Sequence, residues 1–170
     1  MGKVLLVFLS LFILAGCNDS KRPAPYGLDW NITEEQITKT NYFEGNGGTP
    51  HSYNIKVETP DFENGTYSLF FSNNKLVEIQ SIYYAMDDEV KTHRILNYYR
   101  IDFNAKYGNP IIDEQQKYTD CGTAFCPVNR KVYQYDDVIL GVSLYENFVQ
   151  ERLVIISYYD KNYFLNKLKR

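Results

Sequence analysis

Residues 66–84 have the sequence TYSLFFSNNKLVEIQSIYY, in which two runs rich in β-forming residues flank a pair of asparagines. Apolar or aromatic residues recur at every second position on both sides of that pair: Tyr67, Leu69 and Phe71 before it, Val77 and Ile79 after it. This period is typical of strands with one buried face. Asparagine tolerates the positive φ that a tight hairpin turn needs. The stretch therefore predicts an antiparallel hairpin and a sheet with a core face.

Five more strands are predicted around this hairpin, from alternation or from enrichment in Val, Ile, Leu and Tyr. They cover residues 52–58, 115–119, 129–135, 138–145 and 152–159. The second and third of these are expected to form a hairpin whose turn carries two cysteines. Together with the first hairpin, they predict an antiparallel sheet, or sheets, of about six to seven strands.

Three helices are predicted, one long and two short. The first, residues 33–40, begins with the capping box Thr33-Glu34-Glu35-Gln36. The long helix, residues 88–107, has side chains three and four positions apart on one face, which we expect to be core: Leu96, Tyr99, Phe103 and Tyr107. A glycine and a proline then end it. A short helix over residues 160–170 closes the chain.

These elements predict a single α+β domain over residues 26–170. Its halves, 31–84 and 87–159, are a candidate pair of repeats, because each has a helix followed by an antiparallel meander. This order of elements is similar to that of outer-membrane assembly lipoproteins and of the beta-lactamase inhibitory protein. Both act by binding other proteins, so the resemblance implies a binding role, although it rests on element order alone.

Residues 1–16 have the parts of an export signal: a positive Lys3, then an apolar run over 4–14 that is too short to span a bilayer. The run ends in Leu14-Ala15-Gly16-Cys17, which resembles the lipobox of bacterial lipoproteins. The resemblance implies that a peptidase cuts before Cys17 and that the Cys17 thiol carries a lipid anchor. The alternative is an ordinary secretory signal with an incidental cysteine.

Residues 17–25 are predicted to be a lipid-anchored tether, because they contain two prolines and have no apolar periodicity. The predicted partner of acylated Cys17 is the lipid bilayer. A periplasm-facing position follows from this anchor. Asn18-Asp19 does not decide between the two membranes of a Gram-negative envelope, and we expect the outer membrane rather than the inner one.

Cys121 and Cys126 are predicted to form a disulfide, since they lie five positions apart in an exported domain. A loop of about six residues limits the stabilisation to roughly 2 kcal/mol, so the bond is a local staple. The alternatives are a redox pair and a metal site. The spacing is not Cys-x-x-Cys, and no histidine is near in the sequence.

Charge argues against a nucleic-acid partner. The chain has a formal charge of −3, and removal of residues 1–16 leaves 17 basic and 21 acidic residues, a formal charge of −4. Proteins that bind nucleic acid by contacting phosphates are usually basic.

The sequence shows no catalytic constellation. His51 and His93 lack the spacing of a zinc site, and Ser143 lacks the second glycine of a nucleophile elbow. Two acidic clusters do not follow the alternating pattern of a calcium loop: Asp87-Asp88-Glu89 and Asp136-Asp137. We therefore expect no catalytic residue, no metal and no cofactor. A hydrolase site assembled only in three dimensions stays open as an alternative.

The best candidates for binding residues are adjacent tyrosines, because one member of a strand pair must leave the core. The chain has 16 tyrosines, with pairs at Tyr83-Tyr84, Tyr98-Tyr99 and Tyr158-Tyr159. Outward tyrosines that merely cover the sheet are the alternative. The sequence thus predicts an envelope lipoprotein that binds another protein, as an assembly accessory, an inhibitor or an immunity factor. A small-ligand or glycan binder with an aromatic groove is the second hypothesis.

Overall fold

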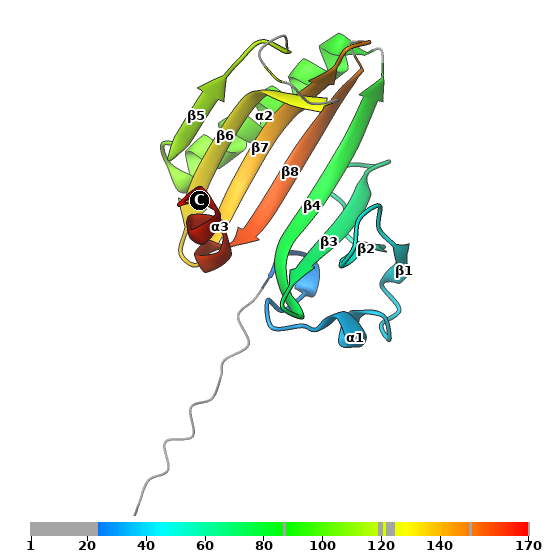
Figure 1. Cartoon of the computed structure of the whole chain (residues 1–170). Coiled ribbons are helices and arrows are strands. Elements are labelled where there is room, and N and C mark those ends of the chain that lie inside the picture. The colour runs from blue at the N-terminus through cyan, green and yellow to red at the C-terminus, as the bar shows by residue number, and fades with distance from the viewer. Residues whose placement is uncertain (1–23, 87, 119–120, 122–124, 150, 170) are drawn as a thin grey trace, which may run out of the picture.

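A computed structural model describes residues 24–169, except 87, 119–120, 122–124 and 150. Within these residues the chain forms one eight-stranded antiparallel sheet, two α-helices shorter than nine residues and one long helix (Figure 1). The strands are β1 (Phe43–Asn46), β2 (Ser52–Ile55), β3 (Thr66–Ser72), β4 (Lys75–Met86), β5 (Ile112–Gln115), β6 (Phe125–Tyr135), β7 (Val138–Asn147) and β8 (Arg152–Asp160). The helices are the 3-10 turn η1 (Pro25–Gly27), α1 (Glu34–Ile37), α2 (Glu89–Tyr107) and α3 (Lys161–Leu168).

The strand order across the sheet is β1-β2-β3-β4-β8-β7-β6-β5, and every neighbouring pair is antiparallel. Each half of the chain is therefore a helix followed by a four-stranded meander, and the two meanders join through β4 and β8. The predicted hairpin is β3–β4, in which Asn73 and Asn74 have φ of 51° and 59°. The α+β class and this hairpin are confirmed.

The two edge strands differ from the prediction. The sequence pattern misses β1, whose residues FEGN show no alternation and include a glycine. The strand predicted at 115–119 is β5, which lies earlier, at 112–115, and pairs with β6 from Ile112–Val132 to Gln115–Asn129. Both strands are short and carry little apolar surface. They are strands because they pair with an inner strand, and the periodicity of a single segment cannot predict such pairing.

Two other boundaries also shift. The capping box at Thr33 is present, but α1 ends at Ile37 instead of continuing to residue 40. The strand predicted at 129–135 begins earlier, so that Cys126 lies inside β6 instead of in the turn before it. Cys126 is buried there, since β6 pairs with β7 as far as Phe125.

The helices α2 and α3 cover opposite faces of the sheet. Tyr133 and Leu140 pack in the same cluster as Phe103 of α2, whereas their chain neighbours Val132 and Ile139 pack against Phe164 of α3. Successive strand residues point to opposite faces, so the two helices must lie on different sides. In Figure 1, α3 lies in front of the sheet and α2 behind it. We call these two sides the α2 face and the α3 face.

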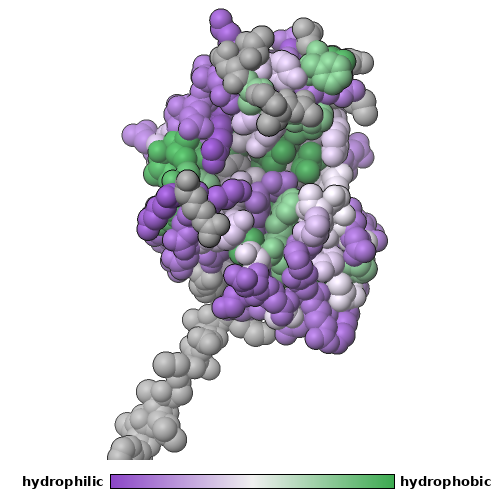
Figure 2. Space-filling model, viewed as in Figure 1, coloured by the Kyte–Doolittle hydropathy of each residue, from purple (hydrophilic) through white to green (hydrophobic). Residues whose placement is uncertain are grey.

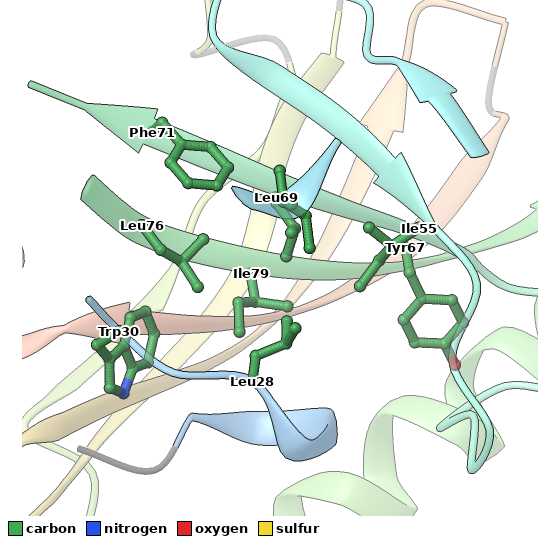
Figure 3. Close-up of a cluster of buried hydrophobic side chains, with 9 residues drawn as sticks. Leu28, Trp30, Ile55, Tyr67, Leu69, Phe71, Leu76 and Ile79 are labelled. Carbon is green, nitrogen blue, oxygen red and sulfur yellow. The ribbon is translucent and has the colours of Figure 1, made fainter. Parts of the chain in front are cut away.

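The N-terminal segment covers the rest of the α2 face. Leu28, Trp30 and Ile37 pack on side chains of β2, β3 and β4 (Figure 3), and the cluster also contains Ile55, Tyr67, Leu69, Phe71, Leu76 and Ile79. The α2 face is thus covered at both ends. Only α3 packs on the α3 face among the described helices, and it covers strands β6 to β8 at one end.

Candidate functional site

A groove of about 340 Å³ lies between α2 and the loop before β3. We call it the aromatic groove. Helix α2 supplies one wall, β4 supplies Tyr83, and residues 61–64 supply the other wall. Its lining residues are Asp61, Phe62, Glu63, Asn64, Tyr83, Lys91, Arg94, Ile95, Tyr98 and Tyr99.

Four aromatic rings form a continuous series along this groove. The Phe62 ring centroid lies 5.5 Å from that of Tyr83 and 5.6 Å from that of Tyr99, and Tyr98 lies 5.2 Å from Tyr99. The Tyr98–Tyr99 pair is nearly perpendicular, an arrangement that aromatic quadrupoles favour. Phe62 is buried, whereas Tyr98 is 64% exposed. The groove therefore has a packed floor and one exposed aromatic rim.

Hydrogen bonds hold the loop that forms the far wall. Tyr99 Oη donates to the Asp61 backbone oxygen at 2.8 Å, and Phe62 N donates to Tyr67 Oη at 3.0 Å. The Asp61 carboxylate accepts from Ser81 Oγ at 2.7 Å and also from Tyr26 Oη. Tyr26 immediately follows the predicted tether. The groove loop is thus tied to β3, β4, α2 and the N-terminal segment at once.

Charges of both signs line the aromatic groove. Lys91 Nζ lies 5.3 Å from the centroid of the Tyr83 ring, within the range of a cation–π interaction. The hydrogen bond with Tyr83, then the nearby charges of Asp88 and Glu63, raise the pKa of Lys91. Lys91 and Arg94 are one turn apart on the helix wall, opposite the acidic loop wall. The arrangement can hold a partner that has an apolar group beside polar or charged ones.

The outer surface of α2 carries exposed apolar side chains, which the sequence pattern did not predict. The inner side carries the expected core residues Leu96 and Phe103. On the outer side, Val90 is 69% exposed, Tyr98 64% and Ile101 69%. At 3.6 residues per turn these three side chains project from one side of the helix. They lie among exposed polar side chains such as Lys91, Arg94 and Asn97.

The three predicted tyrosine pairs do not form one patch. Tyr83, Tyr98 and Tyr99 come together in the aromatic groove. Tyr158 packs in the core beside Tyr26, at a centroid distance of 5.9 Å. Tyr159 lies on the α3 face against Phe164, at 5.0 Å. The sequence did not point to Phe62, Lys91 or Arg94 as groove residues. For the two helix residues a signal was present, because positions 91, 94, 95 and 98 lie three or four apart and so share one side of the helix.

The other residues considered in the sequence make structural contacts. Cys121 and Cys126 form a disulfide. His51 Nδ1 contacts the Glu34 carboxylate at 3.1 Å, and His93 Nε2 lies 3.7 Å from Glu89; both imidazoles are on the surface. Ser143 lies in the middle of β7 and is buried.

The acidic clusters occupy a helix start and a turn. Asp88 caps α2, since its Oδ1 accepts from Lys91 N at 2.8 Å, and Asp136 adopts a φ of 47° between β6 and β7. Asp87 and Cys17 lie outside the described residues. In the described part of the chain, no group of three or more His, Cys, Asp or Glu is placed to hold a metal ion. The same part contains no helix that is long and apolar enough to cross a membrane.

The buried tyrosines predict a loss of stability at alkaline pH. Burial, the largest cause, and the nearby Asp61 carboxylate raise the pKa of Tyr26 and Tyr158 far above the usual value near 10. Above that pH the unfolded chain loses these protons while the folded chain keeps them. The free energy of unfolding is therefore expected to fall by about 1.4 kcal/mol per pH unit for each such tyrosine.

Urea denaturation followed by circular dichroism between pH 9 and 11.5 measures this fall. The Tyr158→Phe variant has one phenol fewer and is expected to show a shallower slope. A free energy of unfolding that stays constant across this range would contradict the assignment of these phenols to the core.

The structure thus defines a single-sheet α+β protein with a surface groove beside a helix that exposes three large apolar side chains. No family model matches the sequence, and neither a curated protein nor a solved structure matches it.

Proposed function

We propose that the protein is a lipid-anchored envelope lipoprotein whose domain binds another envelope protein through α2 and the aromatic groove. The observation that carries the binding role is the exposed outer side of α2, with Val90, Tyr98 and Ile101. Covering these side chains would remove a large apolar area from water, which is the main favourable contribution to protein association. Tyr98 belongs both to this side and to the groove, so the two form one continuous surface.

Charge indicates the chemistry of the partner. Helix α2 contains four cationic residues and two acidic ones, in a mature chain whose formal charge is −4. A basic, apolar helix on an acidic protein fits a partner surface that combines apolar and acidic residues. This role covers an assembly accessory, an inhibitor or an immunity factor, and it involves binding instead of catalysis.

The anchoring half of the proposal rests on the lipobox at Leu14-Ala15-Gly16-Cys17. An acylated Cys17 would hold the domain at a membrane, on the side that faces the periplasm. We expect this to be the outer rather than the inner membrane. Two or three acyl chains hold a protein stably, whereas one chain binds only marginally.

Site-specific photocross-linking tests the docking surface. A photoreactive residue at Ile101, in the cells that make the protein, is expected to give one discrete cross-linked product with a partner identifiable by mass spectrometry. The matched position is Leu168 on α3, which is also exposed but lies on the other face of the sheet. Equal cross-linking from both positions would contradict the proposal.

The purified partner then allows a quantitative comparison. Ile101→Asp is expected to weaken its binding at least tenfold, because it places a carboxylate in an apolar contact, whereas Leu168→Asp is expected to leave the affinity unchanged. Unchanged binding by Ile101→Asp would overturn the assignment of α2.

The aromatic groove also supports a second candidate function, the binding of a small ligand or glycan. Its volume of about 340 Å³ and its series of four rings suit a sugar or another flat molecule. The two candidates differ in what fills the groove: a ligand would raise the melting temperature of the protein in the absence of any partner protein.

A further inference from the structure

A second hollow, of about 240 Å³, lies on the α3 face, where Figure 2 shows hydrophobic and hydrophilic residues both reaching the surface. It opens over β6, β7 and β8, and α3 forms one wall. We call it the polar cavity. Its lining residues are Pro127, Arg130, Val132, Gly141, Ser143, Tyr145, Ser157, Tyr159, Phe164, Lys167 and Leu168.

Small residues on adjacent strands form the floor of the polar cavity. Gly141 of β7 pairs with Ser157 of β8 and with Val132 of β6, and Ser143 pairs with Arg130. A Cβ placed on Gly141 would meet its nearest atoms at 3.9 Å, an ordinary van der Waals contact, so there is room for a methyl group above this glycine. Large side chains would normally fill this position beneath a helix. The floor is therefore hollow because of the sequence and not because of poor packing.

Two cations and no acidic residue line the polar cavity. Arg130 of β6 lies beside the ring of Phe164 of α3, with its Cζ 5.9 Å from the ring centroid. Lys167 also belongs to α3 and lines the cavity. The Arg130 guanidinium also meets the Glu114 carboxylate at 3.5 Å, but Glu114 is well exposed and the pair is correspondingly weak. The guanidinium is thus positioned by an aromatic ring and is not neutralised inside the cavity.

Hydroxyl groups also line the polar cavity. Ser157 and Tyr159 supply them, and the buried Glu78, whose carboxylate accepts from Gln80 Nε2 at 2.6 Å, pairs with Tyr159 across β4 and β8. A hydroxyl oxygen can accept a hydrogen bond from a ligand donor. Burial raises the pKa of Glu78, in line with its position behind these hydroxyls. The cavity therefore combines two cations, Arg130 and Lys167, with hydroxyl groups that can accept hydrogen bonds.

We propose that the polar cavity binds a small carboxylic acid that also carries hydroxyl or amide donors, such as a sugar acid or an N-acylated amino acid. The carboxylate would bind Arg130 and Lys167, because a guanidinium and a carboxylate form paired, charge-assisted hydrogen bonds. The donors would face Ser157 and Tyr159. This site lies on the face opposite to α2, so it is separate from the proposed protein-binding surface and does not depend on it.

Isothermal titration calorimetry with the full-length lipidated protein in detergent micelles tests the proposal. The probes are glucuronate and N-acetylglycine as the two sources of the acid, glucose as the neutral counterpart and inorganic phosphate as a simple anion. At least one of the acids is expected to bind saturably with one site, and at least tenfold more tightly than both glucose and phosphate. No saturable binding of either acid, or equal binding of phosphate, would overturn the proposal.

Variants assign the binding to this cavity. Arg130→Gln is expected to weaken the acid at least tenfold, and Gly141→Val is expected to abolish binding by filling the floor. Gly141→Ala adds only the Cβ, for which there is space, and is expected to weaken binding by a smaller factor with the fold intact. Lys39→Gln, which removes an exposed cation outside both the aromatic groove and the polar cavity, is the control with unchanged affinity. Full affinity in both Arg130→Gln and Gly141→Ala would show that the acid binds elsewhere.

Discussion

Replacing Cys17 with serine is expected to move the protein almost completely from the membrane fraction to the soluble fraction. The hydroxyl of serine cannot take the thioether-linked lipid, so the variant lacks the acyl chains that are proposed to hold the protein at the membrane. Ultracentrifugation of cell lysates after a salt wash, followed by immunoblotting, measures the distribution.

Two controls make this result specific. Ser20→Ala changes the predicted tether but keeps the lipobox, and it is expected to remain in the membrane pellet. The released Cys17→Ser protein should keep the circular dichroism spectrum of a folded domain, since Cys17 precedes the core segments that begin near Leu28. Cys17→Ser protein that still sediments after the wash would contradict lipid anchoring.

The proposed anchor would also limit where a partner can be. Residues 18–25 span roughly 28 Å at most when fully extended, since each residue adds at most about 3.5 Å. A partner of α2 should therefore lie close to the membrane that holds the lipid, and activity that depends on this proximity should be lost in Cys17→Ser.

Trp30→Ala is expected to lower the free energy of unfolding by about 3–5 kcal/mol, the largest loss of stability from a single substitution that we expect. Trp30 is 1% exposed and closes the part of the α2 face that α2 does not reach. Its indole nitrogen has no hydrogen-bond partner among the described residues, so the loss arises from packing. The cavity left by the indole would lie between Leu76 and the N-terminal segment.

Urea denaturation followed by circular dichroism measures this loss. Fluorescence cannot be used, because Trp30 is the single tryptophan of the chain. Trp30→Phe, which keeps an aromatic ring, is expected to cost less, and Val90→Ala at an exposed position should change stability by no more than about 0.5 kcal/mol. A loss below 1 kcal/mol in Trp30→Ala would mean that the N-terminal segment does not belong to the core.

The same segment contributes to the wall of the aromatic groove. Tyr26 packs between Tyr67 and Tyr158, and its hydroxyl meets both Asp61 and Ser81. Asp61 in turn lines the groove. The first residues after the predicted tether are therefore part of the structure that shapes the binding surface.

Local patterns in the sequence predicted the inner strands well. The hairpin at Asn73-Asn74 and the long helix before Gly108 depend on residues two to four positions apart, which a single segment contains. The disulfide between Cys121 and Cys126 was predictable for the same reason, since its two ends are five positions apart.

The binding surfaces were less accessible to sequence reasoning. The aromatic groove combines residues 61–64, Tyr83 and one side of α2, and the polar cavity combines small residues of three strands. The residues of each set are far apart in the chain. Their contact depends on which strands become neighbours, and no local period carries that information.

By itself, the sequence determined the α+β class, the β3–β4 hairpin, the extent of α2 and the disulfide pair, whereas the export signal and its lipobox stay predictions. Only the tertiary structure decided that β4 and β8 join the two halves into one sheet, where β1 and β5 pair, and which helix covers which face. The physical reason is that periodicity within one segment sets its secondary structure and its buried side. The choice of neighbours depends on how all buried sides can be covered together, which is a property of the whole chain.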